Sequence, residues 1–222
     1  MARSPLSPRK EATQRRAQQT VEAILEAAAQ VLTERGYAAG TTNHIAERAG
    51  VSIGSLYQYF PNKDAILVAL VERHLADANA LLLPLFERAT SAPRGLEPLL
   101  REFVEATISF HTRNPALHRL LFEEAPHPKQ VRKALHALED SMASRMVSLL
   151  RRHPEARRGG LEAAAYVAVH AIEGLAHHFV LHAPHGMAEA DLVHEAVSLL
   201  LGYLAEPGAP SARRRRREPR ST

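Results

Sequence analysis

The stretch that decides the fold runs from Thr41 to Lys63 and is Thr41-Thr42-Asn43-His44-Ile45-Ala46-Glu47-Arg48-Ala49-Gly50-Val51-Ser52-Ile53-Gly54-Ser55-Leu56-Tyr57-Gln58-Tyr59-Phe60-Pro61-Asn62-Lys63. Apolar residues recur at helical spacing on both sides of Gly50, which predicts two short helices joined by a glycine turn. Thr41 or Thr42 can cap the first helix, and Ser52 can cap the second. The pattern is that of a helix-turn-helix.

The second helix of this pair is predicted to expose polar groups on one side. Leu56 and Phe60 are four residues apart, so both face the interior. Hydroxyl and amide side chains are then left for other surfaces: Ser55, Tyr57, Gln58 and Tyr59. Such groups hydrogen-bond to phosphate oxygens and base edges, so the pattern indicates DNA binding. Pro61 is predicted to end this helix, and Asn62 to cap the next one.

A structural interpretation of the same residues remains open. Tyr57 and Tyr59 can pack against neighbouring helices, and Lys63 can be a solvated residue in a first helical turn, where the helix dipole slightly disfavours its charge. For Tyr59, groove contact and structural support are both compatible with the pattern.

The segment from about Thr20 to Leu75, about a quarter of the chain, closely resembles the DNA-binding domain of TetR-family transcriptional regulators. The resemblance is carried by Val21-Glu22-Ala23-Ile24-Leu25, Gly36-Tyr37, Thr42, Ile45-Ala46, Ala49-Gly50-Val51-Ser52, Gly54-Ser55-Leu56-Tyr57, Tyr59-Phe60, Lys63 and Leu67.

This resemblance implies roles for individual residues. Three are expected to hold phosphates: Thr42, Tyr57 and Lys63. Others are expected to face bases or sugars: Asn43, Ile53, Gly54, Ser55, Gln58 and Tyr59. Thr41 and Ser52, at the two caps, complete the predicted DNA-binding set. Asn43, Ile53 and Gln58 vary widely among family members, so no operator sequence is predicted.

Composition favours a helical protein with two parts. The chain has 222 residues, enough for a DNA-binding module and a larger body with its own core. It contains no cysteine, so disulfides and thiolate metal sites are excluded and a reducing cytoplasm is expected. No apolar run is expected to span a bilayer, and the start of the chain lacks the apolar segment of a signal peptide.

Positive charge is concentrated at the two ends. Residues 1–16 carry a formal charge of +4 and residues 213–222 one of +5, which leaves −5 for the remainder of a chain whose net charge is +4. Residues 1–16 are predicted to be a disordered basic arm, which either reaches DNA or is a solvated leader. Residues 207–222 are predicted to be a disordered Arg-rich tail, which either adds salt-sensitive DNA affinity or is a bystander.

The remainder is rich in helix-forming residues. Helices are predicted at 63–90, 96–113, 115–124, 128–152, 161–183 and 188–205. With three helices before Lys63, the prediction is an all-α protein of about nine helices. An N-terminal three-helix DNA-binding domain is expected at 17–75, and a larger effector-binding and dimerisation domain at 76–206.

The last two predicted helices carry more apolar residues than one buried side needs. These are Val167, Ala171, Gly174, Leu175, His178 and Leu181, followed by Leu192, Ala196, Leu199, Leu200 and Tyr203. The family resemblance implies a four-helix bundle with a second copy, which sets two recognition helices about 34–36 Å apart, one turn of DNA. The alternative is that the pair covers only the core of its own chain.

The resemblance also implies a small-molecule effector among the middle helices. Its candidate lining is Phe103, Thr107, Phe110, Phe122, Met142, Met146, Tyr166 and His170. Such a stripe also occurs in an ordinary helical core. A modest apolar or amphipathic effector is expected.

Other classes of function fit the sequence less well. His178, His182 and His185 suggest a metal sensor, but no fourth ligand is evident, so no metal or cofactor is predicted. The motifs of phosphate-binding loops, zinc hydrolases and serine hydrolases are missing, which argues against a helical enzyme. An architectural DNA-binding protein would not need the large body. The sequence therefore predicts a homodimeric, ligand-responsive repressor of the TetR type that binds double-stranded DNA and no membrane.

Overall fold

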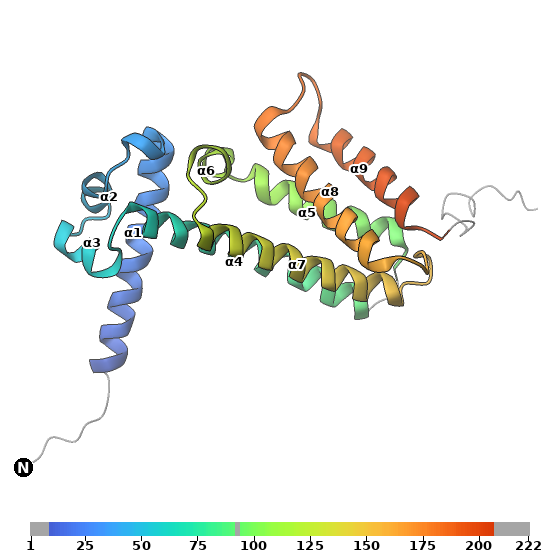
Figure 1. Ribbon diagram of the computed structural model, residues 1–222, viewed down its shortest axis with the longest axis horizontal. Coiled ribbons are helices and arrows are strands. Elements are labelled where there is room, and N and C mark those ends of the chain that lie inside the picture. Colours follow the sequence, from blue (N-terminus) through green and yellow to red (C-terminus); the bar gives the residue numbers. More distant parts are fainter. Residues whose placement is uncertain (1–8, 92–93, 207–222) are drawn as a thin grey trace, which may run out of the picture. The chain divides into compact units, whose positions relative to one another are not determined.

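The computed structural model describes residues 9–91 and 94–206, and these residues are largely helical (Figure 1). Nine α-helices and one π-helical turn occur within these two ranges, and no strand is formed there. The all-α prediction is confirmed. The chain divides into two units. The first runs up to His74 and also includes Ala116–Arg132, and the second comprises Leu75–Pro115 and the residues from Lys133 onward.

The first unit is built on α1 (Arg9–Ala39), α2 (Thr42–Arg48), α3 (Ile53–Tyr59) and the start of α4 (Lys63–Ser91). Its core is a set of large apolar side chains with almost no exposure: Ile24, Leu32, Ile45, Leu56, Ile66, Leu67 and Leu70. Near its end α1 is bent at Gly36, whose φ of 75° is unfavourable for a residue with a Cβ atom.

The start of α1 differs from the prediction of a disordered arm at 1–16. Helix α1 already begins at Arg9, directly after Pro8. The physical reason is composition, because residues 9–19 are mostly Arg, Lys, Glu, Ala and Gln, all good helix formers. Residues 1–8 and the predicted tail at 207–222 lie outside the described residues.

A second segment of the chain packs into the first unit. Helix α6 (Pro115–Arg119) continues into the π-helical turn η1 (Leu120–Glu124), which closes with a 2.9 Å hydrogen bond from Ala125 N to Leu120 O. η1 contacts α1. The single helix predicted at 115–124 is thus split in two, and residues 116–132 join the DNA-binding unit although they were assigned to the second domain.

The second unit consists of α5 (Leu96–Thr112), α7 (Lys129–Arg152), α8 (Leu161–His182), α9 (Glu189–Leu204) and the rest of α4. Helix α5 contacts both α8 and α9, which form an antiparallel pair (Figure 1). At the end of α9, a bridge between Ala156 and Ala205 attaches the loop before α8. These helices begin and end within two residues of the predicted bounds, because Pro and Gly residues interrupt the helical pattern at these positions.

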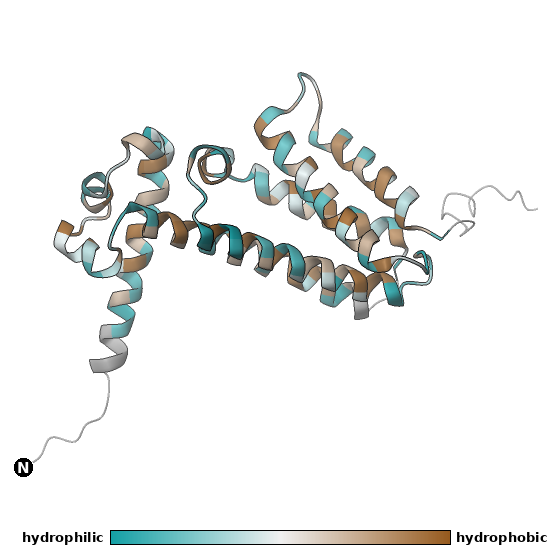
Figure 2. Ribbon diagram, in the orientation of Figure 1, coloured by the Kyte–Doolittle hydropathy of each residue, from teal (hydrophilic) through white to brown (hydrophobic). Residues whose placement is uncertain are grey.

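Helix α8 is long and apolar enough to cross a membrane by length and composition, with a hydropathy of 1.2. The expectation that no run would meet this criterion was therefore wrong. Its buried side belongs to the core shared with α5 and α9, through Ala164, Ala168 and Ile172. Hydrophobic residues also occur on the remainder of α8 and on α9 (Figure 2). The apolar composition of α8 is explained by two apolar faces, one of which packs in the core.

Candidate DNA interface

The helix-turn-helix is held by the caps that its sequence predicts. Thr41 Oγ1 accepts a hydrogen bond from His44 N at 3.3 Å, and Ser52 Oγ accepts one from Ser55 N at 3.0 Å. Gly50, between α2 and α3, has a φ of 67°, so the turn uses the left-handed conformation that glycine tolerates. The predicted turn and both predicted helix starts are confirmed.

Helix α3 buries one side and exposes apolar groups on the other. Leu56 is fully buried and Phe60 is 8% exposed, as their spacing predicts. In contrast, Ile53, Tyr57 and Tyr59 are 38%, 49% and 37% exposed. Among the described residues, large exposed hydrophobic side chains gather on α3 and on the α8–α9 pair, apart from Met187 between those two helices. A short helix with this much uncovered aromatic surface is suited to contact another molecule.

Two of the predicted phosphate contacts lie side by side. The hydroxyl oxygens of Thr42 and Tyr57 are 3.0 Å apart and form a hydrogen bond between α2 and α3. Asn43 and Gln58 are exposed, whereas Ser55 is half-buried. The first turn of α2 and the exposed side of α3 therefore present hydroxyl and amide groups from one continuous structural element.

Gly54 has no structural need to be glycine. A Cβ atom at this position would meet nothing closer than Ser52 Oγ at 3.8 Å. Glycine inside a helix costs roughly 0.5–1 kcal/mol relative to alanine, so the fold alone would favour a larger residue. The lack of a side chain leaves the backbone of α3 open to close approach from outside.

Lys63 occupies a different position from a solvated first-turn residue. Its ammonium group donates hydrogen bonds to the carbonyl oxygens of Tyr37 at 2.5 Å and Gly40 at 3.0 Å, with Ala38 O at 3.4 Å. It also lies 4.3 Å from the centre of the Tyr37 ring. We call this arrangement, together with Asp64, the α1–α4 clamp. Neither the clamp nor its partners are evident from helical spacing.

Asp64 completes the clamp through the Tyr37 hydroxyl, which donates a short hydrogen bond to its carboxylate. Burial, reinforced by this hydrogen bond and the charge of Asp64, raises the pKa of Tyr37 well above its ordinary value. Tyr37 therefore remains a hydrogen-bond donor throughout the physiological pH range.

Helix α2 is fixed to α1 by Arg48. Its guanidinium forms a bidentate pair with Glu34 at 2.8 and 2.9 Å and a 3.2 Å hydrogen bond to Gln30. The hydrogen bond from Arg48 holds the pKa of the exposed Glu34 below its usual value. The two helices also border an open groove of about 380 Å³.

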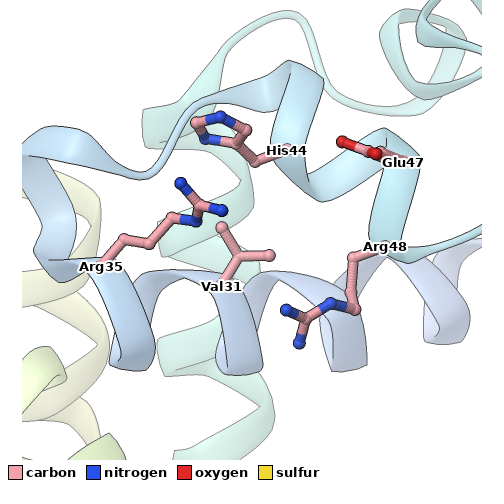
Figure 3. Close-up of a pocket in the computed structure, with 5 residues that line it drawn as sticks. All are labelled: Val31, Arg35, His44, Glu47 and Arg48. Carbon is pink, nitrogen blue, oxygen red and sulfur yellow. The ribbon is translucent and has the colours of Figure 1, made fainter.

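Figure 3 shows the five residues that line this groove: Val31, Arg35, His44, Glu47 and Arg48. The Arg35 side chain extends toward His44, whereas the Arg48 side chain reaches from α2 down to α1 (Figure 3). Glu47 offsets the positive charge of Arg35, and Glu34 offsets that of Arg48. The groove therefore carries no dominant charge of either sign.

The second unit contains a small cavity of about 30 Å³. Its lining is Leu82, Phe86, Phe103, Thr107, Met142, Met146, Val169, Ile172 and Glu173. Four residues of the predicted effector site are in this set: Phe103, Thr107, Met142 and Met146. Glu173, its one charged member, was not part of the predicted site.

The other predicted effector residues lie elsewhere. Phe122 belongs to η1 in the first unit, and Phe110 is buried but does not line the cavity. Tyr166 is 56% exposed and stacks on His170, with ring centres 4.0 Å apart. His170 Nε2 lies 3.8 Å from Glu139 Oε2 on α7, and neither Tyr166 nor His170 lines the cavity. These four residues are therefore removed from the proposed lining.

Polar groups gather at the Glu173 end of the cavity. Glu173 Oε2 lies 3.4 Å from His111 Nε2 and 3.6 Å from His177 Nε2. Burial, with the nearby charge of Glu139, raises the pKa of Glu173 to about 7. Burial also lowers the pKa of His111, against the effect of its hydrogen bond to the Thr107 carbonyl. His111 comes from α5, and helical spacing in the sequence does not connect it with Glu173 and His177 on α8.

The predicted dimer surface separates into two groups in the structure. Leu192, Ala196 and Leu200 are buried in the core of their own unit, because they fall on the side of α9 that packs inward with α5. They are removed from the proposed interface. Val167, Gly174, His178, Leu199 and Tyr203 are exposed, while Ala171, Leu175 and Leu181 are half-buried.

Comparison with known proteins assigns both parts of the chain. Residues 24–70 match the family "Bacterial regulatory proteins, tetR family", and residues 96–204 match "Tetracyclin repressor-like, C-terminal domain". The fold and the helix-turn-helix thus define a DNA-binding transcriptional regulator. The chain belongs to the TetR family.

Individual relatives are more distant. The HTH-type transcriptional activator FasR of Mycolicibacterium smegmatis is 33% identical over 124 residues, which are 54% of this chain and 55% of that protein. The nucleoid occlusion factor SlmA of Glaesserella parasuis is 27% identical over 136 residues, 59% of this chain and 64% of that protein. The chain therefore spans less than two thirds of the length of these curated relatives.

Solved structures share the fold. A TetR-family regulator from Mesorhizobium loti has a TM-score of 0.71 at 18% identity, covering 86% of this chain and 99% of that one. FadR of Bacillus subtilis in complex with stearoyl-CoA has a TM-score of 0.66 at 19% identity, covering 82% and 98%.

Substitution of Lys63 can show whether this residue stabilises the fold through the clamp or binds a DNA phosphate. Lys63→Ala removes hydrogen bonds from a charged donor to carbonyl oxygens, and we expect the free energy of unfolding to fall by about 2 kcal/mol. The measurement is urea denaturation, with the exposed Lys133→Ala as the matched control. Unchanged stability, with a salt slope of DNA binding reduced by about one, would assign Lys63 to a phosphate instead.

Proposed function

We propose that this chain is a homodimeric, sequence-specific DNA-binding repressor that leaves a palindromic operator when a small molecule binds its second unit. The proposal is supported above all by α3, a capped recognition helix with an exposed glycine and exposed aromatic residues. A cytoplasmic location follows from this role. Repression is the usual mode of regulation in this family, but the relative FasR is named as an activator. Transcription in vitro would show whether this protein represses or activates its target.

Helix α3 and the start of α2 are proposed to divide two tasks. Thr42 and Tyr57 hold phosphates with their adjacent hydroxyls, which positions the protein without reading sequence. Asn43, Ser55 and Gln58 contact base edges, together with Ile53, Gly54 and Tyr59, which lie on the exposed side of α3. Thr41 and Ser52 cap the two helices and lie at the edge of the same surface.

The exposed face of α8 and α9 is proposed as the contact with a second copy. Its large exposed hydrophobic residues are Tyr166, Val167, Leu199 and Tyr203. A Cβ atom at Gly174 would meet nothing within 4 Å in its own chain, so this glycine leaves room for close helix approach. A two-fold arrangement of this face would bury it and place two recognition helices on one side of the DNA.

The effector is proposed to enter between α4, α5, α7 and α8, where the cavity lies. At about 30 Å³ the cavity must expand, and the flexible side chains of Met142 and Met146 permit this. Leu82 and Phe86 belong to α4, the helix that begins at Lys63, so a ligand that displaces them acts on the element that anchors the DNA-binding helices. Release requires that the ligand bind the DNA-free state more tightly.

Selection of duplexes from a random pool tests the proposal, with the complex sized at several salt concentrations. We expect a palindromic site bound by a dimer, and Gln58→Ala should change base preference at one position by about 1–3 kcal/mol while leaving other positions unaffected. Weak binding with no enriched sequence and abolition by salt would instead indicate an architectural protein that uses its basic tails.

The selected complex then serves as the assay for the effector. Long-chain acyl-CoA is the first probe, since a structural neighbour is FadR in complex with stearoyl-CoA. Release of the duplex by the acyl-CoA, but not by free coenzyme A, is the expected result for an effector whose apolar part occupies the cavity.

Gly54→Ala separates the needs of the fold from those of DNA binding. The substitution should raise the free energy of unfolding by roughly 0.5–1 kcal/mol, because alanine favours the helix and the structure has space for its methyl group. We expect it to weaken operator binding at least tenfold by blocking close approach. A more stable protein with unchanged affinity would show that α3 does not approach DNA at this position.

A further inference from the structure

Two helices of the second unit direct three metal-ligating side chains toward one point. Glu173 and His177 are one turn apart on α8 and share a face, and His111 comes from the last turn of α5. Glu173 Oε2 is 3.4 Å from His111 Nε2 and 3.6 Å from His177 Nε2. The ligand atoms of the two histidines lie within 4.8 Å of one another.

These separations match the coordination shell of a small divalent ion. Zinc binds imidazole nitrogen and carboxylate oxygen at about 2.0–2.1 Å, so two ligands of a tetrahedral site lie about 3.3–3.4 Å apart. The distances from Glu173 to His111 and His177 exceed this by only a few tenths of an ångström. The two histidine ligand atoms, which lie within 4.8 Å of one another, must approach further for all three ligand atoms to reach bonding distance.

His111 is also oriented as a metal ligand requires. Its Nδ1 donates a 2.7 Å hydrogen bond to the Thr107 carbonyl oxygen, which fixes the ring and directs Nε2 toward Glu173. Metal-binding histidines commonly make such a bond with their second nitrogen. His111 is 5% exposed, whereas the side chains of Glu173 and His177 are 32% and 29% exposed, so an ion can enter from their side.

We propose that His111, His177 and Glu173 bind one divalent transition-metal ion of the Zn²⁺ class. Two imidazoles and one carboxylate suit Zn²⁺, Co²⁺ and Ni²⁺. Glu173 also lines the cavity of the second unit. The site stands on the packing of α5 against α8 and does not depend on the proposed role in DNA binding.

A second pair of histidines on α8 provides the matched control. His178 and His182 are exposed, with ring centres 5.2 Å apart, and helical spacing turns them away from Glu173. Two histidines four residues apart on an exposed helix are a common adventitious chelate. Any experiment on metal binding must distinguish them from the site at Glu173.

The test uses full-length protein without a histidine tag, stripped with a chelator and titrated with Co²⁺, followed by competition with Zn²⁺. We expect one Co²⁺ per chain with the intense visible bands of tetrahedral coordination, displaced by Zn²⁺. Glu173→Gln and His177→Ala should weaken binding at least tenfold, while His178→Ala with His182→Ala should leave these bands unchanged. Zn²⁺ should raise the melting temperature of the parent protein but not that of Glu173→Gln.

Two outcomes would overturn the proposal. One is the lack of a tetrahedral Co²⁺ spectrum in the parent protein. The other is binding that survives Glu173→Gln and is lost in the His178→Ala, His182→Ala variant. Glu173→Gln keeps the size of the side chain, so it remains informative if His177→Ala does not fold.

Discussion

The hydrogen bonds from Lys63 to the end of α1 are the constraint on which the DNA-binding unit depends. A positive charge in the first turn of α4 is disfavoured by the dipole of that helix, but the same charge lies against carbonyl oxygens at the end of α1, where it is favoured. The α1–α4 clamp thereby joins the two ends of the segment that contains α2 and α3. With α2 held to α1 by Arg48, the helix-turn-helix is fixed on both sides.

This rigidity explains how such short helices can act as a recognition element. Helices α2 and α3 have 7 residues each, too few to be stable alone. Their caps satisfy the first backbone N–H groups, and buried Ile45 and Leu56 attach them to the core. The exposed aromatic and polar groups of α3 are consequently presented on a fixed backbone, and the open position at Gly54 becomes a usable point of approach.

Sequence periodicity and punctuation predicted the helices well, and contacts between distant helices poorly. Gly50, Ser52 and Pro61 act within a few residues, so their effects were predictable. The partners of Lys63 lie 23 to 26 residues earlier in the chain, and no local rule connects them. His111 was missed for the same reason, because its partners Glu173 and His177 belong to a helix far along the chain.

The α8–α9 pair shows a related limit. The spacing of Leu192, Ala196 and Leu200 defines an apolar stripe, but periodicity does not tell which neighbour covers it. In the structure α5 covers that stripe, and Leu199 and Tyr203 remain exposed beside it. Knowing that a helix has two apolar sides was possible from sequence, whereas assigning one to the core and the other to a partner required the structure.

Hydrogen exchange of the backbone amides, with and without the selected duplex, tests the central claim most directly. If α3 on its clamped support is the DNA-reading element, protection on binding will concentrate in residues 41–63, with the strongest effect in α3. Protection that spares α3 and appears in the remainder of the chain would contradict this account of how the protein recognises DNA.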